Sequence, residues 1–225
     1  MIYYITNIND IANIPANATV IHIRMFEIIT LMSQLSLLSV RLSRLQLLQE
    51  LYCNYNRLDI LPSLPNSLRV LKCTDGQLTM ISSPLQSPSS QLPQSLQLLD
   101  CSFNRLLTLP ILPPQLRDLY ISNNYLTTLP PLPHSLQILH CSFNRLKTLP
   151  CIPPLLRELW EDDGYQLKQY THMNLQEVKL YQARVIKEHT IKICVFVLSA
   201  TSSQCYRLCA DMIKEIGKEM RLTQI

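Results

Sequence analysis

Leucines recur at a fixed spacing through the middle of the chain, with polar residues and prolines in constant positions between them. Written from its first leucine, the unit is 20 residues long and reads Leu-x-Cys-x-x-Asn-x-Leu-x-x-Leu-Pro-x-Leu-Pro-x-Ser-Leu-x-x. Four of the five steps between copies are 20 residues and the fifth is 28, because residues 82–90 form a Ser/Pro/Gln-rich insertion that we interpret as a surface loop. The six copies begin at Leu51, Leu71, Leu99, Leu119, Leu139 and Leu159.

Each unit predicts one coil of a solenoid that starts with a short strand. In Leu-x-Cys the leucine and the cysteine point to one side of the strand and the intervening residue points to the other. One coil cannot bury its apolar side alone, so the coils must stack in parallel. The Leu-Pro-x-Leu-Pro return cannot be helical, which leaves it extended or polyproline-like and thin. We therefore predict an α/β repeat, a short curved solenoid with parallel strands on its concave face.

An asparagine follows the strand in most units. Its amide can pair with backbone groups that are freed where the strand ends, and we expect these amides to form a ladder between coils. Gly76 and Gly164 stand in its place in two units, where the ladder should be weaker. The asparagines are Asn56, Asn104, Asn124 and Asn144.

Residues 1–47 predict a divergent N-terminal cap. Ile8, Ile11 and Ile14-Pro15 align with the apolar positions of the repeat and place a strand at Ile21–Ile23. Thirty residues then precede Leu51 where the period allows 20. Leucines within them follow the alternating four- and three-residue spacing of a helix, so we predict an inserted amphipathic helix over residues 26–47, with a degenerate repeat as the alternative.

The repeat extends over residues 48–164, and residues 165–225 have a different pattern. We predict a helix over 174–188, a strand over 191–198 and a second helix over 203–222. A helix-strand-helix block of this size can hardly fold alone, so we expect a C-terminal α/β cap on the last coil. A small effector module or a dimerisation element is the alternative.

Charge and composition exclude several classes of function. Residues 1–164 contain 11 Lys/Arg and 11 Asp/Glu, so the net charge of +4 resides in the tail, and a neutral body argues against nucleic-acid binding. The longest apolar run, Ile193 to Leu198, is far too short to span a membrane, and no secretory signal is visible. Only three glycines are present, far apart, which excludes a glycine-rich phosphate loop.

Eight cysteines suggest a disulfide or zinc scaffold, but their spacing indicates a core role. Four of them occupy the inward strand position that Ile121 fills in another unit, and such a position is apolar. No Cys-x-x-Cys and no pair of histidines at metal spacing is present, so we expect no metal and no cofactor. Buried reduced thiols indicate a reducing compartment, and we expect a cytoplasmic protein. The four cysteines are Cys53, Cys73, Cys101 and Cys141.

The unit resembles leucine-rich repeats of the 20-residue LPX class found in bacterial type III secreted effectors and in giant DNA viruses of protists. The Cys-x-x-Asn-x-Leu and Leu-Pro-Asn-Ser-Leu segments look closer to the viral proteins. The resemblance covers residues 48–160 and, weakly, 8–24. It implies a host-directed or intracellular binding protein. The sequence differs from the bacterial pattern in having cysteine where valine is usual and no large catalytic domain.

The segment Cys209-Ala210-Asp211 resembles the Cys-x-Asp motif of the ubiquitin-ligase domains that follow such repeats in some effectors. A cysteine beside a carboxylate could form a thioester, so a ligase that uses Cys209 is an alternative function. The segment after the repeats is several times shorter than those domains. Cys209 also lies at helical spacing with Cys205 and Met212, which is typical of a core position.

The outward strand positions predict the functional surface, because ligands usually bind the concave face of such solenoids. Four of the six residues in the central column are Tyr, His or Trp, which dominate protein interfaces. We therefore predict a monomeric, non-enzymatic module that binds a protein or peptide, with a structural, self-associating protein as another alternative. The predicted binding residues are Tyr52, Lys72, Asp100, Asp118, Tyr120, His140 and Trp160.

Overall fold

The computed structural model describes residues 1–23, 32–81, 92–160, 175–180 and 182–184. The chain divides into two compact units, Met1–Thr171 and His172–Ile225. The first unit contains the repeats and the second contains helical residues 175–180 and 182–184, where the sequence predicts a helix. The predicted strand over 191–198, the helix over 203–222 and Cys209 lie outside the described residues.

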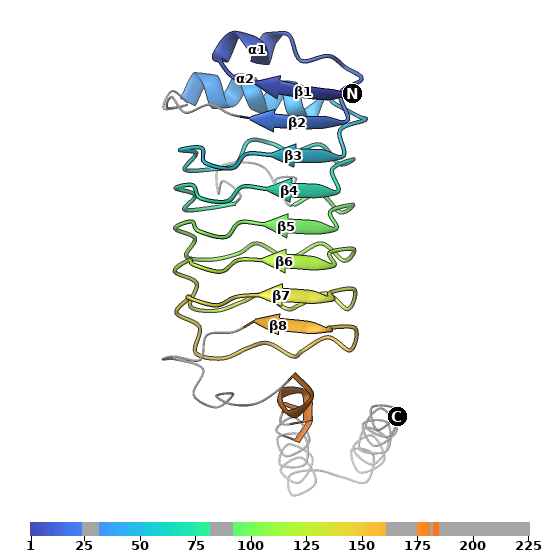
Figure 1. Cartoon of the computed structure of the whole chain (residues 1–225), viewed down its shortest axis with the longest axis vertical. Coiled ribbons are helices and arrows are strands. Elements are labelled where there is room, and N and C mark those ends of the chain that lie inside the picture. Colours follow the sequence, from blue (N-terminus) through green and yellow to red (C-terminus); the bar gives the residue numbers. More distant parts are fainter. Residues whose placement is uncertain (24–31, 82–91, 161–174, 181, 185–225) are drawn as a thin grey trace, which may run out of the picture. The chain divides into compact units, whose positions relative to one another are not determined.

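One parallel sheet of eight strands runs through the first unit in chain order, so the described unit is a leucine-rich repeat solenoid (Figure 1). Because every coil adds its strand beside the previous one, each strand pairs with its neighbours in sequence. The strands are β1 (Ile2–Ile5), β2 (Val20–Ile23), β3 (Glu50–Tyr52), β4 (Val70–Lys72), β5 (Leu98–Asp100), β6 (Asp118–Tyr120), β7 (Ile138–His140) and β8 (Glu158–Trp160).

The register of the sheet is the one that the 20-residue spacing predicts. Leu51 pairs with Leu71 and Leu71 with Leu99, in spite of the insertion between the last two. The middle residue of β3 to β7 is buried and both its neighbours are half-buried, so each leucine points into the core and the flanking residues point outward. Cys53, Cys101 and the other two repeat cysteines are buried and form no disulfide, which agrees with a core role.

The return segments contain no helix in residues 53–69 and 101–157, as the prolines predict. Each ends in a tight turn in which the leucine of Pro-x-x-Leu donates its amide to the proline carbonyl, as Leu116 does to Pro113 at 3.1 Å. The serine of this turn adds a contact between coils that sequence reasoning missed. Ser95 Oγ donates to Leu68 O at 2.7 Å, and Ser67 and Ser135 make the same bond to the coil before them.

The N-terminal cap differs from the prediction at residues 8–12. The structure has helix α1 (Ile8–Ala12) where the alignment with the repeat predicts an extended return, and an additional strand, β1, precedes it. The local cause is a capping box, in which Asn7 accepts a bond from the Asn9 amide and Asp10 Oδ2 accepts one from the Asn7 amide. The predicted strand at Ile21–Ile23 is confirmed as β2.

The inserted helix is confirmed as α2 (Met32–Ser43), which ends four residues earlier than predicted, while residues 24–31 lie outside the described chain. Leu38 and Leu42 are fully buried, as their helical spacing predicts. Arg41 Nη2 donates to the carbonyl of Ala12 at 2.7 Å, and this bond ties α2 to the end of α1. The two helices lie at the N-terminal end of the sheet (Figure 1).

Candidate partner-binding face

The residues on either side of each central strand leucine form the outward surface of the sheet, here called the strand face. Its two columns bring together all seven residues that the sequence predicts for binding. Asp100, Tyr120, His140 and Trp160 are consecutive neighbours across β5 to β8. Asp118 lies in the other column, two residues before Tyr120 on the same strand. Tyr52 and Lys72 are neighbours across β3 and β4.

Two groups of aromatic rings in contact lie on the strand face. The Tyr120 ring meets His140 edge-on at a centroid distance of 4.7 Å, and His140 lies 5.3 Å from Trp160. Trp160 remains 60% exposed. Aromatic rings in contact at these distances stabilise one another, so the side chains are ordered before any partner binds.

The second group of rings extends the column beyond the predicted residues. His22 stacks on Tyr52 at 4.5 Å with an interplanar angle of 6°, and Tyr4 stacks on His22 at 5.0 Å. Sequence reasoning placed the strand of His22 but did not follow the outward column into it. It missed Tyr4 because β1 lies outside the aligned repeats. Lys72 and Asp100 separate the two groups of rings.

Carboxylates flank the rings and set the electrostatics of the strand face. Tyr52 Oη donates to Glu50 Oε2 at 2.8 Å, and this bond raises the pKa of the tyrosine. Glu158 Oε1 lies 2.9 Å from His140 Nε2. Burial raises the pKa of Asp118, against the opposing effect of Arg117 beside it. Burial, and after it the nearby Asp118, raise the pKa of Tyr120.

The predicted asparagine ladder is present behind one edge of the face. Asn104 Nδ2 donates to Cys73 O in the preceding coil at 2.6 Å, and its Oδ1 accepts the Leu78 amide at 3.0 Å. Asn124 and Asn144 repeat both bonds on the coils before them, and Asn56 Nδ2 donates to Ile23 O. These side chains hold the coils, and with them the strand face, at a fixed spacing.

The ladder is interrupted at Gly76, as predicted, and the structure shows why no side chain fits there. A Cβ atom on this residue would lie 2.7 Å from Asn104 Oδ1 and 3.1 Å from Asn56 O. The backbone still connects the coils there, because the Gly76 amide donates to Phe103 O at 3.1 Å, as the Asn104 amide does to Asn123 O. Gly164 lies outside the described residues.

The residue before each ladder position has a left-handed backbone, which the sequence did not predict. Its φ lies between 55° and 59° in five coils, although none of the five is glycine. This conformation costs a residue with a side chain about 1–2 kcal/mol. It lets the amide reach the next coil, as Phe103 N does to Ser122 O at 2.9 Å. The five residues are Tyr55, Asp75, Phe103, Asn123 and Phe143.

Within the described part of the chain, no cluster of three or more His, Cys, Asp or Glu could hold a metal. Nor does any described helix have the length and apolar character needed to cross a bilayer.

The comparisons with known proteins agree with this architecture. The family model for the leucine-rich repeat matches residues 115–134, which is one coil. Together with the 20-residue repeat and the parallel sheet, this match supports the architecture of a leucine-rich repeat solenoid. No curated protein matches the sequence.

Among solved structures, YopM from Yersinia enterocolitica is 29% identical over 66% of this chain, with a TM-score of 0.53. The leucine-rich repeat domain of a Shigella effector is 33% identical over 52% of this chain and 49% of its own, with a TM-score of 0.46. The match covers only 29% of the YopM chain. The solenoid is thus similar in fold to part of the YopM chain.

Proposed function

We propose that the protein is a non-enzymatic recognition module that binds a protein or peptide partner through the strand face. The observation that carries this proposal is the column of rings outside the sheet, which runs from Tyr4 to Tyr52 and resumes at Tyr120. A core does not need these side chains, because Lys72 and Asp100 occupy the same column between them.

The residue types suit a polypeptide partner. Aromatic side chains offer a large contact area with few rotatable bonds, so little entropy is lost when they are covered. The exposed Trp160 provides the largest such area at one end of the column. Asp100, Asp118 and Glu158 give the β5–β8 part of the strand face negative charge, which favours partners that carry Lys or Arg at the contact.

The setting of this interaction is proposed from the similarity of the repeats. Repeats of the LPX class occur in proteins that act inside host cells, and the buried reduced thiols of this chain suit a reducing cytoplasm. We propose a monomeric protein that acts in the cytoplasm of a host cell. The repeat segments of this chain look closer to those of the viral proteins, so a viral origin stays a prediction.

Two triple variants test the strand face. In the first, Tyr52, Tyr120 and Trp160 are changed to serine, which the sheet should tolerate because polar residues already occupy this column. In the control, Leu107, Ile111 and Leu155 are changed to serine; these side chains are 54–73% exposed and lie outside the strand face.

Each variant and the wild type are used to capture proteins from host-cell lysate, with quantification by mass spectrometry. The proposal predicts proteins that the wild type and the control capture equally and that the strand-face variant loses at least tenfold. Equal capture by all three proteins, or loss only in the control, would reject the strand face as the binding surface. Light scattering at several concentrations tests the monomeric state.

A further inference from the structure

A second surface lies along the edge where the strands end, and the proposed function does not use it. Three coils carry the triplet aromatic-Asn-Arg there: Tyr55-Asn56-Arg57, Phe103-Asn104-Arg105 and Phe143-Asn144-Arg145. The asparagine of each triplet is the ladder residue, buried in Asn56 and Asn104 and half-buried in Asn144, whereas the aromatic and the arginine on either side of it are exposed. We call these six exposed residues the arginine edge.

The fold does not require these residue types. The two intervening coils have the same backbone, with Asp75 and Asn123 in the left-handed conformation, and they carry Gln77 and Tyr125 in the place of arginine. Asparagine and aspartate suit a positive φ better than a bulky ring does. The aromatic residues therefore occupy a strained position, where they also expose 54–66% of their surface. Residues that break a local rule are expected at functional or strained sites, so these rings are candidates for a functional surface.

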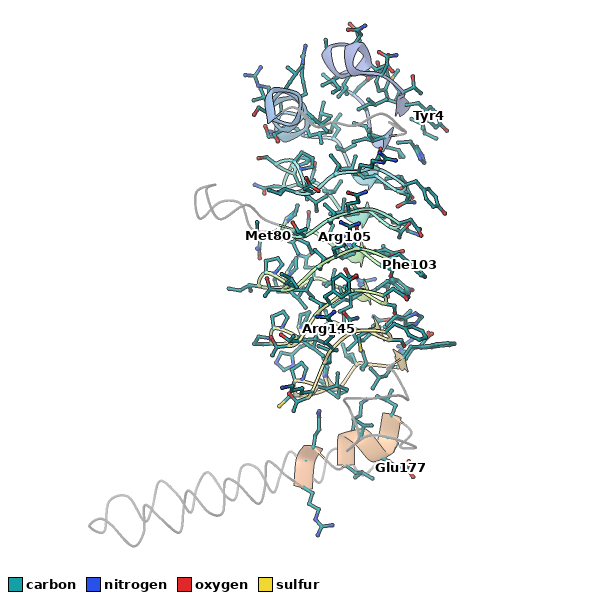
Figure 2. All side chains as sticks on the ribbon, turned by 90° about the vertical axis from the view of Figure 1, so that its left-hand side faces the viewer. Tyr4, Met80, Phe103, Arg105, Arg145 and Glu177 are labelled. Carbon is teal, nitrogen blue, oxygen red and sulfur yellow. The ribbon has the colours of Figure 1, made fainter. Side chains whose placement is uncertain are left out.

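The arginines of the edge are available for a partner. Arg57 and Arg105 make no ion pair or side-chain hydrogen bond with any described residue. The guanidinium of Arg145 lies 4.7 Å from the centroid of the Tyr125 ring, which orders it without neutralising its charge. In Figure 2, which looks onto this side of the stack, Arg105 and Arg145 lie one above the other.

The net charge of this edge is positive. Lys147 adds a fourth exposed cation, and the exposed carboxylates of the five equivalent segments are Asp59 and Asp75. These segments are residues 55–59, 75–79, 103–107, 123–127 and 143–147. The charge is thus complementary to an acidic partner. Arginine binds carboxylates in a bidentate manner, and an adjacent ring adds apolar contact to each such pair.

The spacing of the arginines restricts the conformation of this partner. The three triplets lie on the coils of β3, β5 and β7, so consecutive arginines are two coils apart. Neighbouring strands are about 4.8 Å apart, which separates these coils by about 10 Å. An extended or polyproline chain rises about 3.1–3.3 Å per residue, so every third residue advances by the same distance.

We propose that the arginine edge binds an extended acidic segment of a partner protein that has a carboxylate at every third residue. The segment runs along the axis of the repeats, with one carboxylate on each arginine and its intervening residues on the exposed rings. This surface is distinct from the strand face, so one protein can engage both.

The probe for this proposal is a fluorescein-labelled (Glu-Pro-Pro)₄ peptide, and its binding is followed by fluorescence anisotropy. The comparison peptide, Glu₄Pro₈, has the same composition but clustered carboxylates. We expect saturable binding of the spaced peptide that weakens with salt and is at least threefold tighter than that of the clustered one. Failure of the spaced peptide to bind, or equal binding of both peptides, would overturn the proposal.

Glutamine substitutions identify the surface, because Gln77 already stands in place of arginine in one coil. R57Q/R105Q/R145Q should weaken binding at least tenfold. R69Q/R117Q/R157Q is the matched control, since these three exposed arginines lie before β4, β6 and β8 with the same two-coil spacing but without aromatic neighbours. Binding of the control should change by less than threefold. An equal loss in both triples would show unspecific attraction and contradict the proposal.

The rings are tested by the variant F103N/F143N. It replaces both rings by asparagine, which Asn123 already provides at the equivalent position of another coil. It should weaken binding several-fold while its melting temperature stays at or above that of the wild type. Retained binding would show that the rings play no part. A twelve-residue oligo(dT) is the competing probe, and tighter binding of this strand than of the spaced peptide would mean that the edge recognises nucleic acid instead.

Discussion

Replacement of Asn104 by alanine should loosen the stack of coils at its centre. The side chain is only 6% exposed, and its amide bridges two coils by donating to Cys73 O and accepting the Leu78 amide. Alanine leaves both backbone groups without this partner. Leu78 is itself only 2% exposed, so water does not readily replace the lost bond.

The expected size of the effect follows from these two groups. A buried polar group that loses its hydrogen-bond partner destabilises the folded state by about 1–3 kcal/mol. Two such groups, at about 1.5 kcal/mol each, together destabilise the protein by about 3 kcal/mol. Because domains are stable by only about 5–15 kcal/mol, a loss of this size is a large fraction of the total.

The measurement is urea denaturation followed by circular dichroism, with Asn66→Ala as the control. Asn66 is exposed and its side chain makes no hydrogen bond with any described residue, so its replacement should change the free energy of unfolding by less than about 0.5 kcal/mol. If Asn104→Ala is no more destabilising than Asn66→Ala, the amide ladder does not hold the coils together.

Three further perturbations have defined outcomes. Gly76→Ala should lower the free energy of unfolding by about 1–2 kcal/mol in the same assay, because its Cβ would meet Asn104 Oδ1 at 2.7 Å; an unchanged midpoint would contradict this. Iodoacetamide should label Cys151 in the native protein and spare Cys101, whose burial raises its thiol pKa, and mass spectrometry of the peptides would disprove this if both are labelled equally. Because burial raises the pKa of Asp118, the folded state binds its proton more tightly, so stability falls as pH rises from the unfolded-state value through the folded-state pKa. Asp118→Asn should therefore stabilise the protein at pH 7 but not at pH 3, and equal effects at both would exclude this cause.

The sequence predicts best the features that depend on residues recurring at the same position in successive repeats. The inward leucines and the asparagines recur with the same spacing, so the register of Leu71 on Leu99 could be predicted across the insertion. The position of the outward residues followed from the same register, because side chains alternate along a strand.

The features that the sequence did not reveal depend on local bonds or on single copies. The spacing of Ile8, Ile11 and Ile14 is compatible with a helix as well as with the repeat. The capping box of Asn7 and Asp10 stabilises the helix. The left-handed residues escaped prediction because Tyr55 and Phe103 are not residue types that favour a positive φ. The stacking of Tyr4 and His22 depends on a strand that precedes the recognisable repeats.

The single tryptophan of the chain offers the most direct test of the proposed binding face. Trp160 stands on the strand face with most of its indole exposed, so its fluorescence reports on that face alone. Titration with the purified partner recovered by capture should shift the emission to shorter wavelength and reduce quenching by acrylamide. The control variant Ile111→Ser should show the same shift and the same protection as the wild type. Saturable binding that leaves both the emission maximum and the quenching unchanged would contradict recognition through the strand face.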